Sequence, residues 1–215
     1  MTFSLANLVY LLQGTLWTVA LALLSFVGGG VLGLAVALMR VSRFGALRFA
    51  AGTWIQVVQG IPLPVLIFLS YFGLGVTGFD VPALAAAALS IAVNSSAFLG
   101  DIWRGCIQAV AKTQWEAADS LALNGFQRMV DVVLPQAIRL AIPATIGFSV
   151  QIIKNTSYAV VIGFIELTQS GKIINNALYE PFLIFTIVGL IYFALCSPLS
   201  KASRRLEARL RARGA

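Results

Sequence analysis

QWEAADSLALNGFQRMVDVVLPQAIRLAIP, residues 114–143, is a long amphipathic interruption in an otherwise apolar chain. Apolar side chains recur in it at spacings of three and four residues, the pattern of one helix face. They are Trp115, Ala118, Leu121, Ala122, Phe126, Met129, Val130 and Val133. Asn124-Gly125 favours a break between two short helices, and Pro135 favours a second boundary. The stretch is therefore predicted to form short amphipathic helices between two membrane spans.

The rest of the chain has the composition of an integral membrane protein. Of its 215 residues, 59% are hydrophobic and 11% are charged, whereas soluble domains average about 45–50% apolar and about 25% charged residues. A soluble core of this size cannot bury that much apolar surface, but a bilayer accepts it. No polar or Gly/Ser-rich linker divides the sequence, so residues 1–215 are predicted to form a single all-α membrane domain.

Five apolar runs are long enough to cross a bilayer, which takes about 20 residues per helix. The predicted spans cover residues 15–39, 52–75, 83–103, 141–163 and 182–200. The start of the chain has no basic segment before its first apolar run, so that run is expected to be a retained span rather than a cleaved signal peptide. Gly29 and Gly33 in the first span allow close approach of another helix.

Basic residues predict the orientation of the bundle, because cytoplasmic loops are enriched in Lys and Arg. They gather after the first span (Arg40, Arg43, Arg48), between the third and fourth (Lys112, Arg128, Arg139) and after the fifth (Lys201, Arg204, Arg205, Arg209, Arg211, Arg213). The segments 76–82 and 164–181 carry only Lys172 as a basic residue. The predicted topology has the N-terminus outside, the C-terminus in the cytoplasm, and the segment 112–139 on the cytoplasmic side.

Composition also argues against several classes of site. The chain has no histidine, and Cys106 and Cys196 form no CxxC motif, so we expect no metal site, no redox motif and no cofactor. The net charge of +7 comes from residues that flank apolar runs and gather at the C-terminus. No aromatic side chains interleave with them as stacking platforms for bases. These basic residues therefore predict contact with anionic membrane lipid rather than nucleic acid.

An amphipathic helix on the cytoplasmic side can lie on lipid or dock to a protein. Helices that lie on lipid are usually lined with Lys and Arg on their polar face. This stretch also carries Glu116, Asp119 and Asp131. The acidic residues favour docking to a protein partner.

The stretch resembles the cytoplasmic coupling motif of permease subunits in bacterial binding-protein-dependent ABC importers, and is most similar to the polar amino acid branch. Glu116-Ala117-Ala118 matches the opening of the motif and Leu134-Pro135-Gln136-Ala137 its end. Further matches are Gln114-Trp115, Asn94-Ser95, Ala97-Phe98, Asp101 to Gly105, Lys154-Asn155-Thr156-Ser157 and Glu166-Leu167-Thr168. The likeness extends from about Gly14 to Glu207.

The resemblance implies a five-span permease of the type I importer kind in the bacterial inner membrane. Its expected partners are a second permease subunit, identical or homologous, ABC ATPase subunits below, and a periplasmic binding protein that delivers an amino acid. The residues that would couple it to the ATPase are Glu116, Ala117, Ala118, Gly125, Leu134 and Pro135. The chain lacks a G-x-x-x-x-G-K-[ST] loop, so ATP hydrolysis is assigned to a separate chain, and this subunit is not itself an enzyme.

The sequence departs from the family pattern at two informative places. Ala122 stands where the family usually has Gly, six residues after the Glu, so the turn is made by Gly125 instead or is tighter than usual. The family's Arg-Gly-Thr-Pro in the second span is here Gln59-Gly60-Ile61-Pro62. The Arg and Thr side chains are therefore missing from that span.

Polar residues inside the predicted spans are candidates for the translocation path, because a polar group in the bilayer is costly. The candidates are Gln59, Asn94, Ser95, Asp101, Gln151, Asn155, Thr156 and Ser157. Amide and hydroxyl groups can satisfy the carboxylate and ammonium of an amino acid. Hydrogen bonds that hold the helices together are the alternative role for these side chains, and Asp101 can pair with Arg104 three residues on.

Two other functions are compatible with an apolar chain of this kind. An ion-coupled secondary transporter or channel would use Asp101 as its ion site, but it leaves the amphipathic stretch unexplained. Many such transporters also carry internal repeats, and none is found here. A purely structural membrane anchor would leave the polar residues of the third and fourth spans without a role.

Overall fold

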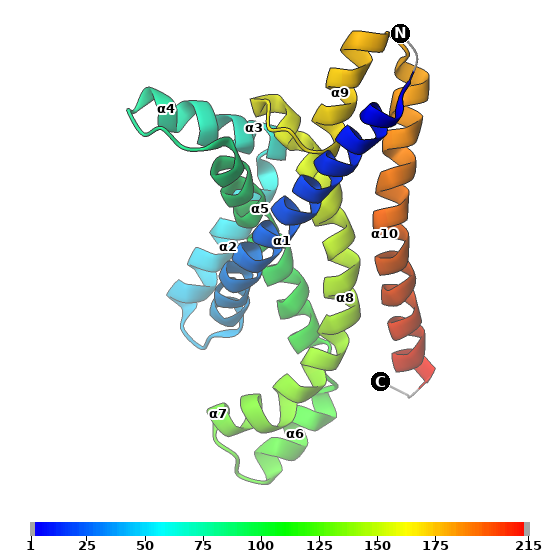
Figure 1. Ribbon diagram of the computed structural model, residues 1–215. Helices are drawn as coiled ribbons and strands as arrows, with labels where there is room; N and C mark the ends of the chain where they lie inside the picture. The colour runs from blue at the N-terminus through cyan, green and yellow to red at the C-terminus, as the bar shows by residue number, and fades with distance from the viewer. Residues whose placement is uncertain (1–2, 213–215) are drawn as a thin grey trace.

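The computed structural model describes residues 3–212, and within that range the chain is helical and contains no β-strand. Figure 1 shows long helices running between the two ends of the molecule, with a short helical hairpin at one end. The helices are α1 (Leu5–Val41), α2 (Gly45–Gly60), α3 (Leu63–Phe68), α4 (Leu74–Val76), α5 (Ala83–Gln108), α6 (Lys112–Ser120), α7 (Gly125–Gln127), α8 (Leu134–Asn155), α9 (Leu167–Leu178) and α10 (Pro181–Ala212). Two π-helical segments, Leu69–Gly73 and Arg128–Val133, and a 3₁₀ segment, Thr156–Ile162, continue neighbouring helices.

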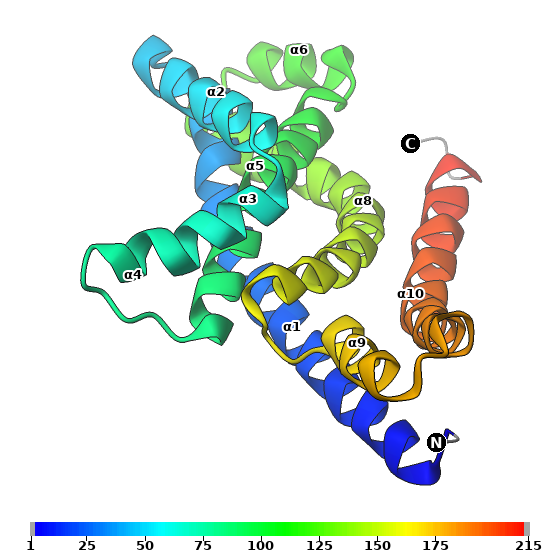
Figure 2. The same ribbon diagram turned by 90° about the horizontal axis from the view of Figure 1, so that it is seen from above.

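Four helical runs in the described residues are long and apolar enough to cross a membrane, and a fifth is counted if the bent pair α2 and α3–α4 is one span. The all-α bundle predicted from the sequence is therefore confirmed. The second span is broken at Ile61 and Pro62, where the two halves meet at 96°. Pro62 and Pro64 explain the break, because proline removes a backbone donor and crowds the preceding turn. Figure 2 shows α3 and α4 extending sideways from the bundle.

Helices α1 and α5 approach each other closely, and glycine makes this contact possible. A Cβ added at Gly29 would lie 2.7 Å from Ser95 Cβ, and one added at Gly33 would lie 3.0 Å from Leu99 Cβ. Gly100 on α5 contributes to the same contact from the other side, since a Cβ there would lie 2.7 Å from Val36 of α1. The predicted small-residue interface is thus present, and α5 is the partner helix that the sequence alone could not name.

Candidate functional site

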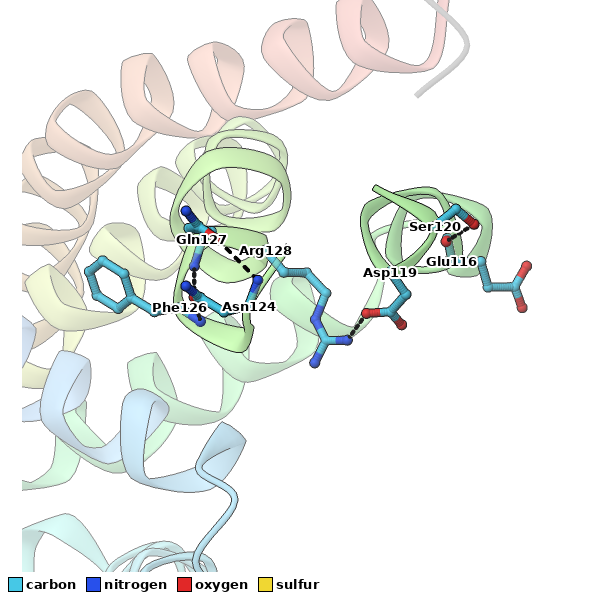
Figure 3. Close-up of polar contacts among 7 residues, drawn as sticks. All are labelled: Glu116, Asp119, Ser120, Asn124, Phe126, Gln127 and Arg128. Carbon is cyan, nitrogen blue, oxygen red and sulfur yellow. Dashed lines mark hydrogen bonds and ion pairs between the residues drawn. The ribbon is translucent and has the colours of Figure 1, made fainter. Parts of the chain in front are cut away.

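The cytoplasmic motif predicted from the sequence folds as a helical hairpin, the coupling hairpin (residues 112–133). Helix α6 ends at Ser120, and Ala122 takes a left-handed conformation with φ of 55°. Asn124 then caps the next helix: its side chain accepts hydrogen bonds from the backbone N–H groups of Phe126 (3.1 Å) and Gln127 (3.0 Å). The Gln127 side chain accepts in return from the Asn124 backbone N–H at 3.1 Å, completing a capping box (Figure 3).

The turn is therefore made at the position where the family usually has glycine, and with an alanine. Gly125 is the first residue of α7 and is not among the residues with positive φ. The alternative in which Gly125 makes the turn is wrong. A left-handed alanine places its Cβ close to the following carbonyl oxygen, which costs about 1–2 kcal/mol.

Two side-chain contacts brace the hairpin across this turn. Arg128 forms an ion pair with Asp119 at the end of α6, as Figure 3 shows. The same guanidinium lies over the ring of Trp115, with Cζ 5.5 Å from the ring centroid. Arg128 thus contacts two residues of the first arm from the second, so a force on either arm reaches the other.

The apolar side chains of the hairpin divide between two environments. Ala118 is 2% exposed and Val133 is fully buried. Val133 forms an apolar cluster with Ile107, Val110 and Ala137, against which Trp115 packs. Leu121 and Phe126, on either side of the turn, are 74% and 76% exposed. The expectation that Ala118 contacts the partner is therefore wrong, because the inner half of the apolar pattern packs on the chain itself and Ala118 supports the hairpin from within.

The remaining predicted coupling residues lie at the surface or at the start of α8. Glu116 and Ala117 are exposed, and Glu116 forms an ion pair with Lys112 at 3.3 Å. Pro135 is exposed and Leu134 is half-buried. The predicted boundary at Pro135 falls where the π-helical turn Arg128–Val133 becomes α-helical, so the chain changes its helix type there without ending.

Four of the predicted path residues line one cavity of about 670 Å³ between α2, α3, α5 and α8. Its polar lining is made by the amides of Gln59, Asn94, Gln151 and Asn155. Gln151 donates a hydrogen bond to Asn155 Oδ1 at 2.9 Å. This bond runs along a single helix and therefore does not itself join α8 to another helix. The apolar lining includes Phe98 and Phe148, whose rings stack at 5.6 Å.

The other predicted path residues are not part of this cavity lining. Ser95 is buried beside Gly29 of α1. Thr156 and Ser157 donate to the backbone oxygens of Ile153 and Lys154, both at 2.7 Å. The Asp101 carboxylate forms the predicted ion pair with Arg104, at 2.9 Å. Thr156, Ser157 and Asp101 therefore have partners within their own helical segment, whereas the buried Ser95 hydroxyl has no hydrogen-bond partner in the described residues.

Glu166 has a buried carboxylate. The sequence predicted only that it lies in the segment 164–181 and in the family match Glu166-Leu167-Thr168. It is fully buried, caps α9 through the backbone N–H of Gln169 (2.9 Å), and accepts hydrogen bonds from Tyr192 (2.8 Å) and Thr18 (3.3 Å). Burial raises the pKa of its carboxyl. The group thereby ties together α1, α9 and α10. Its signal in the sequence was an acidic residue directly before an amphipathic helix, a typical N-cap position.

Residues 29–212 match the model of the family described as binding-protein-dependent transport system inner membrane component. The chain belongs to this family. It is accordingly a multi-pass protein of the bacterial inner membrane and a component of a transport system. Membership supports the permease interpretation over the secondary transporter or channel that the sequence left open, and it leaves no reason to invoke a purely structural anchor.

Individual relatives agree with the family match over nearly the whole chain. The "Probable amino-acid ABC transporter permease protein YckA" of Bacillus subtilis (strain 168) is 36% identical over 188 residues, covering 87% of this chain and 83% of the relative. The "Probable glutamine ABC transporter permease protein GlnM" of the same organism is 31% identical, covering 93% and 92%. A crystal structure of an amino acid ABC transporter with histidines is 34% identical over 97% of this chain and all of that chain, with a TM-score of 0.89. An inward-facing MetNI methionine ABC transporter, 20% identical with a TM-score of 0.79 over 96% and 99% of the two chains, shares the fold.

Proposed function

We propose that this chain is the permease subunit of an ABC importer that carries a polar amino acid. A periplasmic binding protein would deliver the solute, a second permease would complete the path, and separate ATPase chains would hydrolyse ATP. Relatives named for amino-acid or glutamine transport support the substrate class. The amide-lined cavity also supports it, because Gln59, Asn94, Gln151 and Asn155 offer both donors and acceptors to a zwitterion without bringing a full charge.

The observation that carries this proposal is the exposed tip of the coupling hairpin. Leu121 and Phe126 are large apolar side chains that stand out beyond the end of the bundle, each about three-quarters exposed. Exposed apolar tips on a rigid hairpin are typical of a surface that a partner covers. Figure 3 shows Glu116 and Phe126 pointing away from the body of the hairpin, on opposite sides of it. We infer that an ATPase groove receives this tip, as helix-in-groove contacts do.

The internal bracing suggests how a movement of the ATPase would reach the cavity. The hairpin packs on Ile107 at the end of α5 and on Val110 just after it, and its second arm runs without a break into α8. Helices α5 and α8 carry Asn94 and Asn155, which line the cavity. A displacement of the tip would therefore turn the two helices that line the path, which is the kind of two-state change that ligands at a distance can bias.

The proposal is tested by three single changes on the coupling hairpin: Leu121→Asp and Phe126→Asp at its tip, and Glu116→Lys in α6. Each alters an exposed side chain, so insertion and assembly with the second permease should be normal. We expect each variant to lose at least about tenfold of solute uptake, and to lose stimulation of ATP hydrolysis by the loaded binding protein, since burying an unpaired charge at an interface costs several kcal/mol. Uptake and ATPase activity are measured in proteoliposomes.

Ala111→Asp is the matched control, because it adds the same charge as two of the variants at the exposed opposite end of α6. It should transport normally. If the hairpin instead lies on lipid, Glu116→Lys should strengthen attraction to anionic lipid and leave hydrolysis coupled. Normal coupled transport by Leu121→Asp and Phe126→Asp would disprove the docking assignment.

A further inference from the structure

The corner between α1 and α2 concentrates positive charge that pairs with no acidic side chain among residues 3–212. Arg40 ends α1, and Arg43 and Arg48 flank the start of α2. None of these arginines takes part in the ion pairs found within residues 3–212. The first turn of α2 contains no acidic residue. This basic corner (Arg40, Arg43, Arg48) therefore presents three guanidinium groups without a counter-charge from the described chain.

The three arginines are held in place by the backbone of the corner itself. Arg48 donates from one nitrogen to the carbonyl oxygens of Ser42 (3.0 Å) and Arg43 (3.2 Å), and Arg40 donates to the carbonyl oxygen of Arg48 (3.3 Å). Arg40 also has a buried Nε without a hydrogen-bond partner. A guanidinium carries five N–H donors, so most of the donors at the basic corner remain available to an acceptor from outside the chain.

Electrostatics within the corner also favours an added anion. The positive end of a helix dipole lies at its N-terminus and is stabilised by negative charge. Here Arg48 lies close to that end, with its Nη2 4.0 Å from where a Cβ on Gly45 would be. Phe44, which precedes the helix, makes no side-chain capping bond. An anion at the corner would relieve this unfavourable arrangement of like charges.

The surroundings of the basic corner indicate which anion it receives. Phe44, Leu47 and Phe49 are 56%, 39% and 77% exposed and alternate with the arginines along the chain. Arg43 Cζ lies 5.0 Å from the centroid of the Phe44 ring. A dissolved phosphate would gain nothing from these apolar side chains. A phospholipid would, because its phosphate meets the guanidinium groups while its acyl chains cover the aromatic rings.

We propose that the α1–α2 corner is a binding site for the head group of an anionic phospholipid, with Arg43 and Arg48 as its phosphate ligands and Arg40 as their support. In Figure 1 the corner faces the same end of the molecule as the C-terminus and the coupling hairpin. The site therefore lies in the membrane leaflet on the same side as the hairpin. A lipid bound there would hold the connection between α1 and α2 in place.

The test is photocrosslinking of the full-length chain in its assembled complex. Phe44→p-benzoylphenylalanine places an aromatic crosslinker beside Arg43, in vesicles that mix phosphatidylglycerol with an excess of phosphatidylcholine. We expect phosphatidylglycerol adducts to exceed their bulk proportion by about fivefold or more, the factor for one basic residue near an anionic surface. Arg43→Gln with Arg48→Gln should return the adducts to the bulk proportion, and Arg43→Lys with Arg48→Lys should retain most of the enrichment.

Arg204→Gln with Arg205→Gln is the matched control, because it removes the same charge from exposed residues of α10. It should leave the enrichment at position 44 unchanged. If the share of phosphatidylglycerol among the adducts equals its share in the vesicles when all arginines are intact, the proposal is wrong. The three arginines would then only set the orientation of the helices in the membrane. An equal loss in the Arg204 and Arg205 control would also overturn it, since the enrichment would then come from general surface charge. Inorganic phosphate can also be added, at constant ionic strength, to the same vesicles containing the protein with all arginines intact. If the enrichment of phosphatidylglycerol adducts is then lost, the site binds a free anion instead.

Discussion

Asp119 and Arg128 form an ion pair that joins the end of α6 to the helix entering α8 (Figure 3). Their side chains are 56% and 31% exposed, so the pair alone contributes little, about 0.2–1 kcal/mol. Arg128 also lies over Trp115, which adds about 0.5–1 kcal/mol. Arg128 therefore adds a polar link between the two arms to the apolar packing of Trp115 near Val133, and its loss should affect the transmission of movement more than the stability of the bundle.

Arg128→Gln should accordingly insert and assemble at normal levels but show weakened coupling. We expect ATP hydrolysis to proceed while solute uptake per ATP falls severalfold, because the arms are then linked less firmly. The measurement is uptake and hydrolysis in the same proteoliposomes. Arg139→Gln is the control, since Arg139 is an exposed arginine of the same segment with no ion pair within the described residues. The exchange Asp119→Arg with Arg128→Asp should restore part of the coupling, and unchanged coupling in Arg128→Gln would contradict this role.

Ala122 occupies a left-handed conformation that glycine adopts without strain. Ala122→Gly should therefore stabilise the coupling hairpin by about 0.5–1 kcal/mol, after the entropy that glycine gains in the unfolded chain. Hydrogen exchange of residues 112–133 should slow by about two- to fivefold. Ala117→Gly, in the interior of α6, should have the opposite effect of similar size. Faster exchange in Ala122→Gly would show that the positive φ is not strained.

The sequence predicted the all-α bundle because it follows from a local rule. Apolar runs of sufficient length require a bilayer. The ion pair between Asp101 and Arg104 followed from a helical spacing of three residues. Contacts within one helix could thus be predicted from the sequence.

Contacts between helices could not, because spacing says which residues share a face but not what that face meets. Trp115, Ala118, Leu121 and Phe126 share an apolar pattern, yet Ala118 is buried on the chain and Leu121 is exposed. Glu166 likewise gave no sign that Thr18 and Tyr192, far away in the sequence, would enclose it. The docking surface and the buried carboxylate both depend on tertiary packing.

The distribution of arginines predicts that the segment 76–82 is outside and that residues 201–215 are in the cytoplasm. Single cysteines at Thr77 and Lys201, both exposed, test this in a background without Cys106 and Cys196. An impermeant thiol reagent added to intact spheroplasts should label position 77, and position 201 only after permeabilisation. Ser203 is unsuitable, because it is buried and donates to the Pro143 carbonyl at 2.8 Å. Labelling of position 201 in intact cells would reverse the orientation.

Asn155 allows the two roles proposed for intramembrane polar groups to be separated. It is 5% exposed, lines the amide cavity, and accepts a hydrogen bond from Gln151 on its own helix. Asn155→Leu keeps a similar volume and removes the amide, so it should weaken solute binding in the path. The loss of one intramembrane hydrogen bond costs under about 2 kcal/mol, so the complex should remain intact. We expect KM for uptake, or the maximal rate, to change by severalfold while the amount of assembled complex does not.

Ser157→Ala is the control for Asn155→Leu, because Ser157 bonds to the Lys154 carbonyl and is not part of the cavity lining. It should transport as the parent protein does. If Asn155→Leu makes the purified complex dissociate, the amide holds the bundle together and does not belong to the path. If Asn155→Leu leaves both assembly and kinetics unchanged, neither role applies. A change in kinetics with intact assembly is expected, because a bond within one helix connects no second helix that its loss could release.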